Sequence, residues 1–237
     1  MNGNGDGNLT IESELQGAIT HLGLLDLRHL RSMDELAKVT RISHVGTILV
    51  SDQLQGSINR IPMNHVGSIL TIPADMKVKL LTGDLRLEGD FLANEKGDPD
   101  EALLVVGTLM ITSAVQAIGF KSVMLTGELF APKGCESIVT SAISKLIGEL
   151  HFYADEPRVF TGRDRFTSDF FQYLKQPVSL ILRGEFSFDA DVSIELLQAK
   201  VSEVFLWGNI RTANRKQASL LLALAAVKYG DIVAEQP

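Results

Sequence analysis

The fold of this chain is decided by a short phrase whose clearest copy is LTGEL at residues 125–129. Apolar residues alternate through it with a period of two, which is the pattern of a β-strand because successive side chains point to opposite faces. Leu125, Gly127 and Leu129 therefore share the apolar inner face, while Glu128 points outward. A glycine on the inner face fits a column in which neighbouring backbones approach each other closely.

The phrase recurs along the chain as a pattern of five positions. The first is mostly apolar, the second is any residue, the third is glycine, the fourth is mostly polar and the fifth is apolar. Its ten glycines are Gly23, Gly46, Gly67, Gly83, Gly107, Gly127, Gly148, Gly184, Gly208 and Gly230. Their mean separation is about 23 residues, and self-similarity at such a period indicates a repeat protein. A related sequence at residues 160–164 carries Asp164 where other copies have an apolar residue, so we expect a degenerate coil or a loop there.

The segments between the phrases show helix signals in several coils. Ser32 with Glu35 forms a capping-box pattern, and Asn214 with Gln217 forms another. Helical segments are also expected at residues 136–145, 168–175 and 194–200. A strand and a connector in each repeat, stacked on the next repeat, make a solenoid in which each repeat contacts only its neighbours.

We therefore predict an α/β fold, a single-domain right-handed solenoid over residues 11–237, preceded by a flexible N-terminal arm at residues 1–10. It has about ten coils of ~20–24 residues, one parallel β-sheet, and short helices or loops as connectors. A pure parallel β-helix is the alternative. The connectors between Gly46 and Gly83 favour it because they contain Gly, Pro and Asn and little helical periodicity.

The sequence repeat of this chain resembles the repeats of two protein families. The spacing of Leu22, Leu25, Leu27 and Leu30 resembles the L-x-x-L-x-L-x-x-L core of the leucine-rich-repeat superfamily. That resemblance implies a strand-plus-helix solenoid and brings no catalytic residues. The apolar-Gly-acid-apolar phrases are also similar to those of bactofilin-like β-helices, and this second resemblance implies a structural protein that polymerises.

Composition narrows the function classes. The net charge is −7 without a cluster of Lys and Arg, so we expect no binding to nucleic acid, whose phosphates attract basic surfaces. The longest apolar run, residues 220–227, is too short for a membrane span, and a single cysteine, Cys135, favours a reducing compartment. These features predict a cytoplasmic protein without a membrane partner. Because the sequence has no Walker A, G-x-G-x-x-G or G-x-S-x-G motif, we predict a non-enzyme without a cofactor.

The outward positions of the strands carry more apolar residues than a sheet open to water needs. They include Val45, Val66, Val106, Met110, Phe130 and Trp207. Parallel strands that are apolar on both faces are normally covered on both sides. We therefore expect a non-catalytic repeat protein whose sheet face binds a partner protein or a second copy in a homodimer, with these residues as anchors. The chain's own terminal segments are an alternative cover.

Two columns of side chains predict other chemistry. His21, His44 and His65 each lie two residues before a glycine of the phrase, so we expect them to stack on the inner face. Three imidazoles could bind Zn²⁺, but stacking in register sets them in a row, so a hydrogen-bonded polar ladder is the other interpretation.

The second column is an acidic row at the outward position after the glycine. Its members are Glu128, Glu149 and Glu185. Paired carboxylates can hold a cation or divide the acid and base roles of a glycosidase, so a metal-dependent or carbohydrate-active enzyme is the alternative function. An outward acidic row also keeps a sheet soluble. For Cys135, Lys133 and the expected helix start favour a reactive thiolate, and a passive thiol is the alternative.

Overall fold

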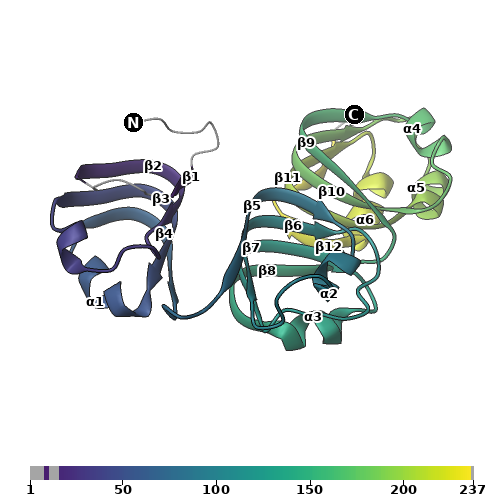
Figure 1. Ribbon diagram of the computed structural model, residues 1–237. Helices are drawn as coiled ribbons and strands as arrows, with labels where there is room; N and C mark the ends of the chain where they lie inside the picture. Colours follow the sequence, from purple (N-terminus) through teal and green to yellow (C-terminus); the bar gives the residue numbers. More distant parts are fainter. Residues whose placement is uncertain (1–7, 11–15, 236–237) are drawn as a thin grey trace. The chain divides into compact units, whose positions relative to one another are not determined.

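The computed structural model describes residues 8–10 and 16–235, which form three parallel sheets joined by short helices and loops (Figure 1). The first sheet has the order β1 (Asn8–Thr10), β2 (Gly17–Asp26), β3 (Val39–Ser51) and β4 (Met63–Ile72). The second has the order β5 (Val78–Leu87), β6 (Ala102–Ile111), β7 (Val123–Pro132) and β8 (Ile143–Tyr153). The third has the order β12 (Ala225–Tyr229), β11 (Val201–Thr212), β10 (Val178–Phe188) and β9 (Glu156–Phe166), and β13 (Ile232–Ala234) also pairs with β11.

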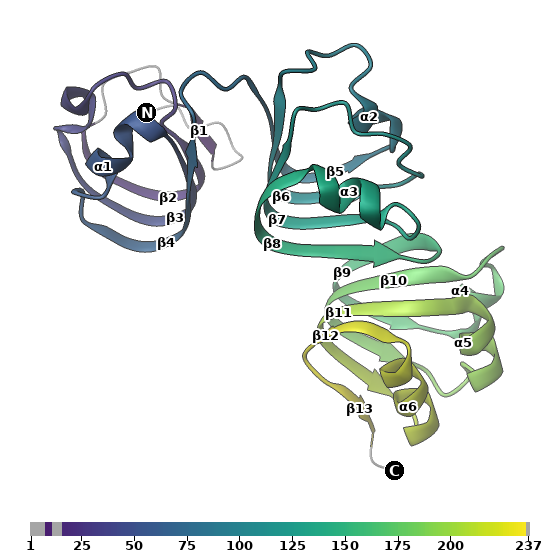
Figure 2. The ribbon, with the colours of Figure 1, turned by 90° about the horizontal axis from the view of Figure 1, so that it is seen from below.

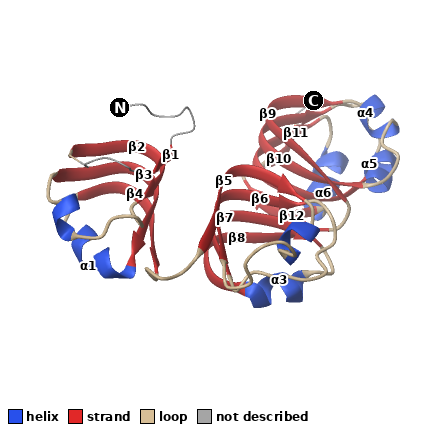
Figure 3. Cartoon of the chain, in the orientation of Figure 1, coloured by secondary structure: helices blue, strands red, loops and turns tan. Residues whose placement is uncertain are grey.

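Short helices occupy many of the connections between strands (Figure 3). They are the 3₁₀ turns η1 (Met33–Leu36) and η2 (Asp52–Leu54), and the α-helices α1 (Gln55–Ile58), α2 (Asp90–Ala93), α3 (Glu136–Ala142), α4 (Ser168–Gln172), α5 (Ile194–Lys200) and α6 (Arg215–Ala223). The side chain of Asn214 caps α6 by accepting a hydrogen bond from the backbone N–H of Gln217 at 3.0 Å. At η1, Glu35 accepts from the backbone N–H of Ser32 at 3.0 Å. Both capping patterns in the sequence therefore mark the start of a helical segment.

The single sheet predicted from the sequence is wrong, and the connection lengths explain why. β4 ends at Ile72 and β5 begins at Val78, while β8 ends at Tyr153 and β9 begins at Glu156. A parallel neighbour in the same sheet requires a crossover of about a dozen residues or more, so at these two points the chain starts a new sheet. The arm predicted at residues 1–10 falls largely outside the described residues, which include only β1 from this segment.

The segment around Gly162 is a full strand, which agrees with the expected degenerate coil and excludes the loop. It lies in β9, which pairs with β10 in register, so that Gly162 stands opposite Gly184 and Asp164 opposite Phe186. The charge at Asp164 is accommodated because β9 is an edge strand of the third sheet and Asp164 is exposed.

Within each sheet the glycines of the phrase stack in a column. A Cβ atom on Gly46 would lie 2.6 Å from the carbonyl oxygen of Gly23, and one on Gly127 would lie 2.0 Å from that of Gly107. Successive coils therefore approach each other so closely that a side chain does not fit between their backbones. In Figure 2 the strands of the first sheet, β2, β3 and β4, run side by side, as their hydrogen-bonded register requires.

The chain divides into two compact units, and sheet packing fills the core of each. The first unit comprises Met1–Met110, Gln116–Leu129 and Ser137–Leu150, and the second comprises Ile111–Val115, Phe130–Glu136 and His151–Pro237. In the second unit, Leu182, Phe186 and Phe188 lie on the inner face of β10, in the alternation that the sequence predicts. In the first unit, outward residues of the first sheet such as Leu49 pack against Leu104 and other residues of the second sheet.

Candidate functional site

Two predicted interface anchors, Phe130 and Trp207, contact each other inside the second unit. Their rings meet edge to face with centroids 5.9 Å apart, and Phe130 is fully buried. Phe205 lies 5.9 Å from Phe130, and the guanidinium of Arg183 lies 5.0 Å from the Trp207 ring centroid. The chain itself therefore covers much of this apolar surface with an aromatic cluster and a cation.

The other four anchors are also engaged within the chain. Val106 packs against the cluster that joins the first and second sheets, and Met110 is 4% exposed. Val45 is buried in the inner core of the first sheet, and Val66 packs against the same core, so these two do not lie on the outward face. Of the six anchors, Val45, Met110 and Phe130 are thus buried within the chain, and Val66, Val106 and Trp207 are half-buried.

The three histidines of the predicted column do stack, but on the outside. The rings of His21 and His44 lie 5.0 Å apart, and those of His44 and His65 lie 4.7 Å apart. All three side chains are exposed, and all three residues have a left-handed backbone, with φ between 53° and 60°. The left-handed conformation interrupts the alternation of the strand, so the residue after each histidine, such as Val45, faces the core in its place.

The stacked rings stand in a row and do not converge on a point. In the described part of the chain, one group of three or more potential metal ligands lies close enough to share an ion, and it contains none of these histidines. The column is therefore an exposed imidazole ladder, and the expected inner-face position is wrong.

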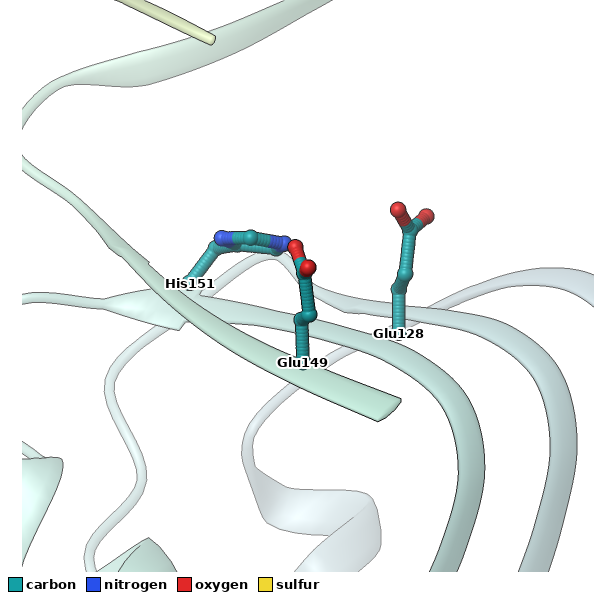
Figure 4. Close-up of side chains that lie close together, drawn as sticks. All are labelled: Glu128, Glu149 and His151. Atoms are coloured by element: carbon teal, nitrogen blue, oxygen red, sulfur yellow. The ribbon is translucent and has the colours of Figure 1, made fainter. Parts of the chain in front are cut away.

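Two of the three carboxylates of the predicted acidic row lie close together in the structure (Figure 4). Glu128 on β7 and Glu149 on β8 lie close to His151, which follows Glu149 by two residues on the same strand and the same face. One ligand atom from each of the three side chains lies within 4.8 Å of the others. Two carboxylates and an imidazole are a ligand set that suits Zn²⁺. All three side chains also have other interactions in the structure.

The third member of the predicted row, Glu185, is not in this group. It lies on β10, where its carboxylate accepts a hydrogen bond from the Asn209 side chain at 2.8 Å. His151 was missed by the sequence analysis because a single histidine two residues from an acid is a weak signal. The detectable clue was that strand alternation places it on the same face as Glu149.

Cys135 is buried and does not resemble a reactive thiol. Its Sγ donates to the carbonyl oxygen of Pro132 at 2.9 Å. Burial raises the pKa of the Cys135 thiol, and the neighbouring carboxylate of Glu136 raises that pKa further. These effects favour the neutral thiol over the thiolate.

A different part of the second unit exposes apolar side chains. We call it the α6–β13 coil (residues 215–234), and it includes Leu222, Tyr229 and Val233, with exposed fractions of 54%, 54% and 48%. Leu222 and Val233 also line a groove between α6 and β13, together with the apolar residues Ala213, Ala218, Ile232 and Ala234 and the polar residues Asn214, Arg215, Ser219 and Glu235. In the described residues, β12 and β13 each pair with β11 alone, so their other edges carry backbone N–H and C=O groups open to a further strand.

No protein-family model, curated protein or solved structure matches the chain. The resemblance to the leucine-rich-repeat superfamily therefore rests on architecture, namely parallel sheets joined by short helices. Among the described helices, none is both long enough and apolar enough to cross a lipid bilayer.

Proposed function

We propose that this chain is a non-catalytic repeat protein that binds a second copy of itself through the α6–β13 coil. The observation that carries the proposal is the concentration of exposed apolar residues there. Of the five large apolar residues that stand out as exposed in the described chain, Leu222, Tyr229 and Val233 belong to this coil. Exposed apolar residues that gather in one place favour association, because burying them removes apolar surface from water.

The chemistry of the two edges of the third sheet favours a closed pair of copies over an open chain of copies. The β9 edge carries Arg158, Arg163, Asp164 and Arg165 as exposed side chains. Charged side chains on an edge strand oppose the addition of another strand. Joining the α6–β13 coil of one copy to the β9 edge of the next would set apolar residues against these charges. A twofold axis sets the same surface of both copies face to face, so that an apolar residue such as Val233 can meet its counterpart. The coil also exposes Arg215, Lys216, Lys228 and Asp231, and of these Asp231 can pair with a basic residue of the second copy.

The edge itself supplies the hydrogen bonds for such a pair. β13 is short and carries Ile232, Val233 and Ala234, residue types that suit a strand at an interface. Pairing of β13 with β13 of a second copy would satisfy the open backbone groups of this edge and bring the two Val233 side chains together.

The test is light scattering coupled to size exclusion over a concentration series of the full chain. We expect a dimer whose fraction rises with concentration, and we expect Val233→Glu to give a monomer because it places two carboxylates in the interface. Tyr173→Glu is the matched control, since Tyr173 is 86% exposed and follows α4, outside the proposed interface.

A monomeric wild-type chain at the highest concentration would overturn the proposal. So would a Val233→Glu variant that remains as dimeric as the wild type. If Tyr173→Glu dissociates the dimer while Val233→Glu does not, the interface lies elsewhere and the assignment to the α6–β13 coil is wrong.

A further inference from the structure

The connection between β8 and β9 is held by polar side chains of the third sheet. It consists of Ala154 and Asp155, the two residues that lie between the two strands. The backbone N–H of Ala154 donates a hydrogen bond to Glu203 Oε1, and that of Asp155 donates to Ser179 Oγ at 3.1 Å. Both backbone donors of the connection therefore depend on side-chain acceptors.

A single carboxylate organises these contacts. Glu203 lies on β11, and its side chain is 7% exposed. In addition to the Ala154 N–H, its Oε1 accepts a hydrogen bond from the hydroxyl of Ser179 at 2.9 Å. This second bond holds the Ser179 hydroxyl in position to accept from Asp155. A buried carboxylate is unfavourable unless it is paired, so the charge of Glu203 requires a cation nearby.

That cation is Lys133, in the turn that follows β7. Its Nζ donates to Glu203 Oε2 at 2.7 Å, and its backbone N–H donates to the carbonyl oxygen of Tyr153 at 2.8 Å. The two partners of the ion pair differ in exposure, because the Lys133 side chain is 51% exposed. The ammonium group can therefore move into water while the strands stay folded, whereas the carboxylate is enclosed. Loss of the ammonium leaves a buried charge and weakens the hold on the connection.

We propose that the Lys133–Glu203 ion pair is a latch, which releases the β8–β9 connection when salt or loss of the lysine charge weakens the pair. Dissolved ions screen a half-exposed pair, since the Debye length falls from about 10 Å at 0.1 M salt to about 3 Å at 1 M. Proteins open locally at such points at a lower free energy than global unfolding requires. In the released state the amides of Ala154 and Asp155 are open to water, while β10 and β11 remain paired.

The experiment is amide hydrogen exchange of the full chain, measured residue by residue with NMR at 0.1 M and at 1 M NaCl. The reporter amides are those of Ala154 and Asp155, and the reference amides are those of Leu182 and Leu206, which are buried in the third sheet. We expect 1 M NaCl to accelerate exchange of the reporter amides about two- to fivefold, the effect of weakening a half-exposed ion pair. The reference amides should exchange at an unchanged rate.

Lys133→Met removes the charge and keeps a long aliphatic side chain. At 0.1 M NaCl it should accelerate exchange of the reporter amides about tenfold to hundredfold, the effect of losing one hydrogen bond to a charged group, and it should abolish the effect of salt. Lys121→Met is the matched control, because Lys121 is exposed in the first unit and its loss changes the net charge equally. The control should leave the reporter amides as they are in the wild type.

Reporter amides that exchange at the same rate in Lys133→Met and in the wild type would overturn the proposal. It would also be overturned if the reporter and reference amides accelerated by the same factor, because the ion pair would then act on the fold as a whole. Reporter amides that do not respond to salt in the wild type would show that ionic strength does not open the latch, and the proposal would be wrong. If Lys133→Met does not fold, the wild-type salt series decides the outcome by itself.

Discussion

The glycine columns predict which substitutions the fold tolerates. Four Gly→Ala variants separate two physical causes of lost stability, namely the steric contact of the new Cβ and a left-handed φ. At Gly46, on the central strand β3, the new Cβ would lie 2.6 Å from the Gly23 carbonyl oxygen, whereas φ is not left-handed. The cost there is steric, about 1–3 kcal/mol of stability. At Gly83 nothing lies within 4 Å, but φ is +86°, so the cost is conformational, about 1–2 kcal/mol.

Gly127 combines both causes and Gly56 has neither. At Gly127 the Cβ would lie 2.0 Å from the Gly107 carbonyl oxygen and φ is +126°, so we expect a loss of about 2–5 kcal/mol. Gly56 lies in α1 with open space around it and no left-handed φ. Alanine there should change stability by no more than about 1 kcal/mol, in the stabilising direction, because it favours a helix.

The assay is equilibrium unfolding of the full chain in urea, followed by circular dichroism. We expect the urea midpoint to fall most for Gly127→Ala, less for Gly46→Ala and Gly83→Ala, and not at all for Gly56→Ala. The reasoning would be refuted if Gly46→Ala unfolded at the same midpoint as Gly56→Ala, because close backbone approach would then carry no cost.

Three further predictions concern the second unit. Glu203→Gln should lower the free energy of unfolding by about 2–4 kcal/mol in the same assay. The buried carboxylate of Glu203 accepts hydrogen bonds from Ser179 Oγ at 2.9 Å and from Lys133 Nζ at 2.7 Å. An unchanged urea midpoint would contradict this prediction. Burial raises the pKa of Tyr153 to about 12, from about 10 in the unfolded chain, so the folded state favours the protonated hydroxyl. The contribution of Tyr153 to stability is therefore complete below pH 10 and is lost as the pH rises toward 12. Tyr153→Phe should flatten this alkaline decline, and an identical pH profile would count against it. Cys135 should react with iodoacetamide much more slowly in the native chain than in urea at neutral pH, because burial raises its pKa; equal rates would show an accessible thiolate.

The strands were predictable from sequence because their signal is local. Alternation around each glycine identifies the strand, and in β10 it correctly places Leu182, Phe186 and Phe188 on the inner face. Helix starts were predictable for the same reason, since Asn214 caps α6 through a hydrogen bond to a residue three positions away.

The division into three sheets was not recognised, although the sequence contains a signal for it. Gly67 and Gly83 are separated by 16 residues, and Gly148 and Gly162 by 14, whereas the steps within a sheet are of 20 residues or more. A strand of ten or eleven residues leaves too few for a crossover in these short steps. An average period conceals this difference, so the prediction of one sheet is wrong at these two points.

The candidate sites depended on tertiary packing, which periodicity does not contain. Strict alternation placed His44 inside and Val45 outside, but the left-handed backbone at His44 reverses both. Histidine is among the residues that occur more often than most with positive φ, so the recurrence of His before Val-Gly was a clue to a bend. The contact of Phe130 with Trp207 joins β7 to β11, and no local pattern predicts it.

The glycine columns also bear on how a chain of this kind can change over evolutionary time. Within a sheet, each glycine that follows another in the column meets the carbonyl oxygen of the preceding glycine in nearly the same way. Duplication or deletion of one whole coil inside a sheet therefore leaves an equivalent contact at the new junction. An insertion of one or two residues within a strand instead displaces its glycine from the column and sets a side chain against a carbonyl oxygen. We therefore expect related chains to differ in length by whole coils, gained or lost inside a sheet, while the two short connections between sheets keep their length.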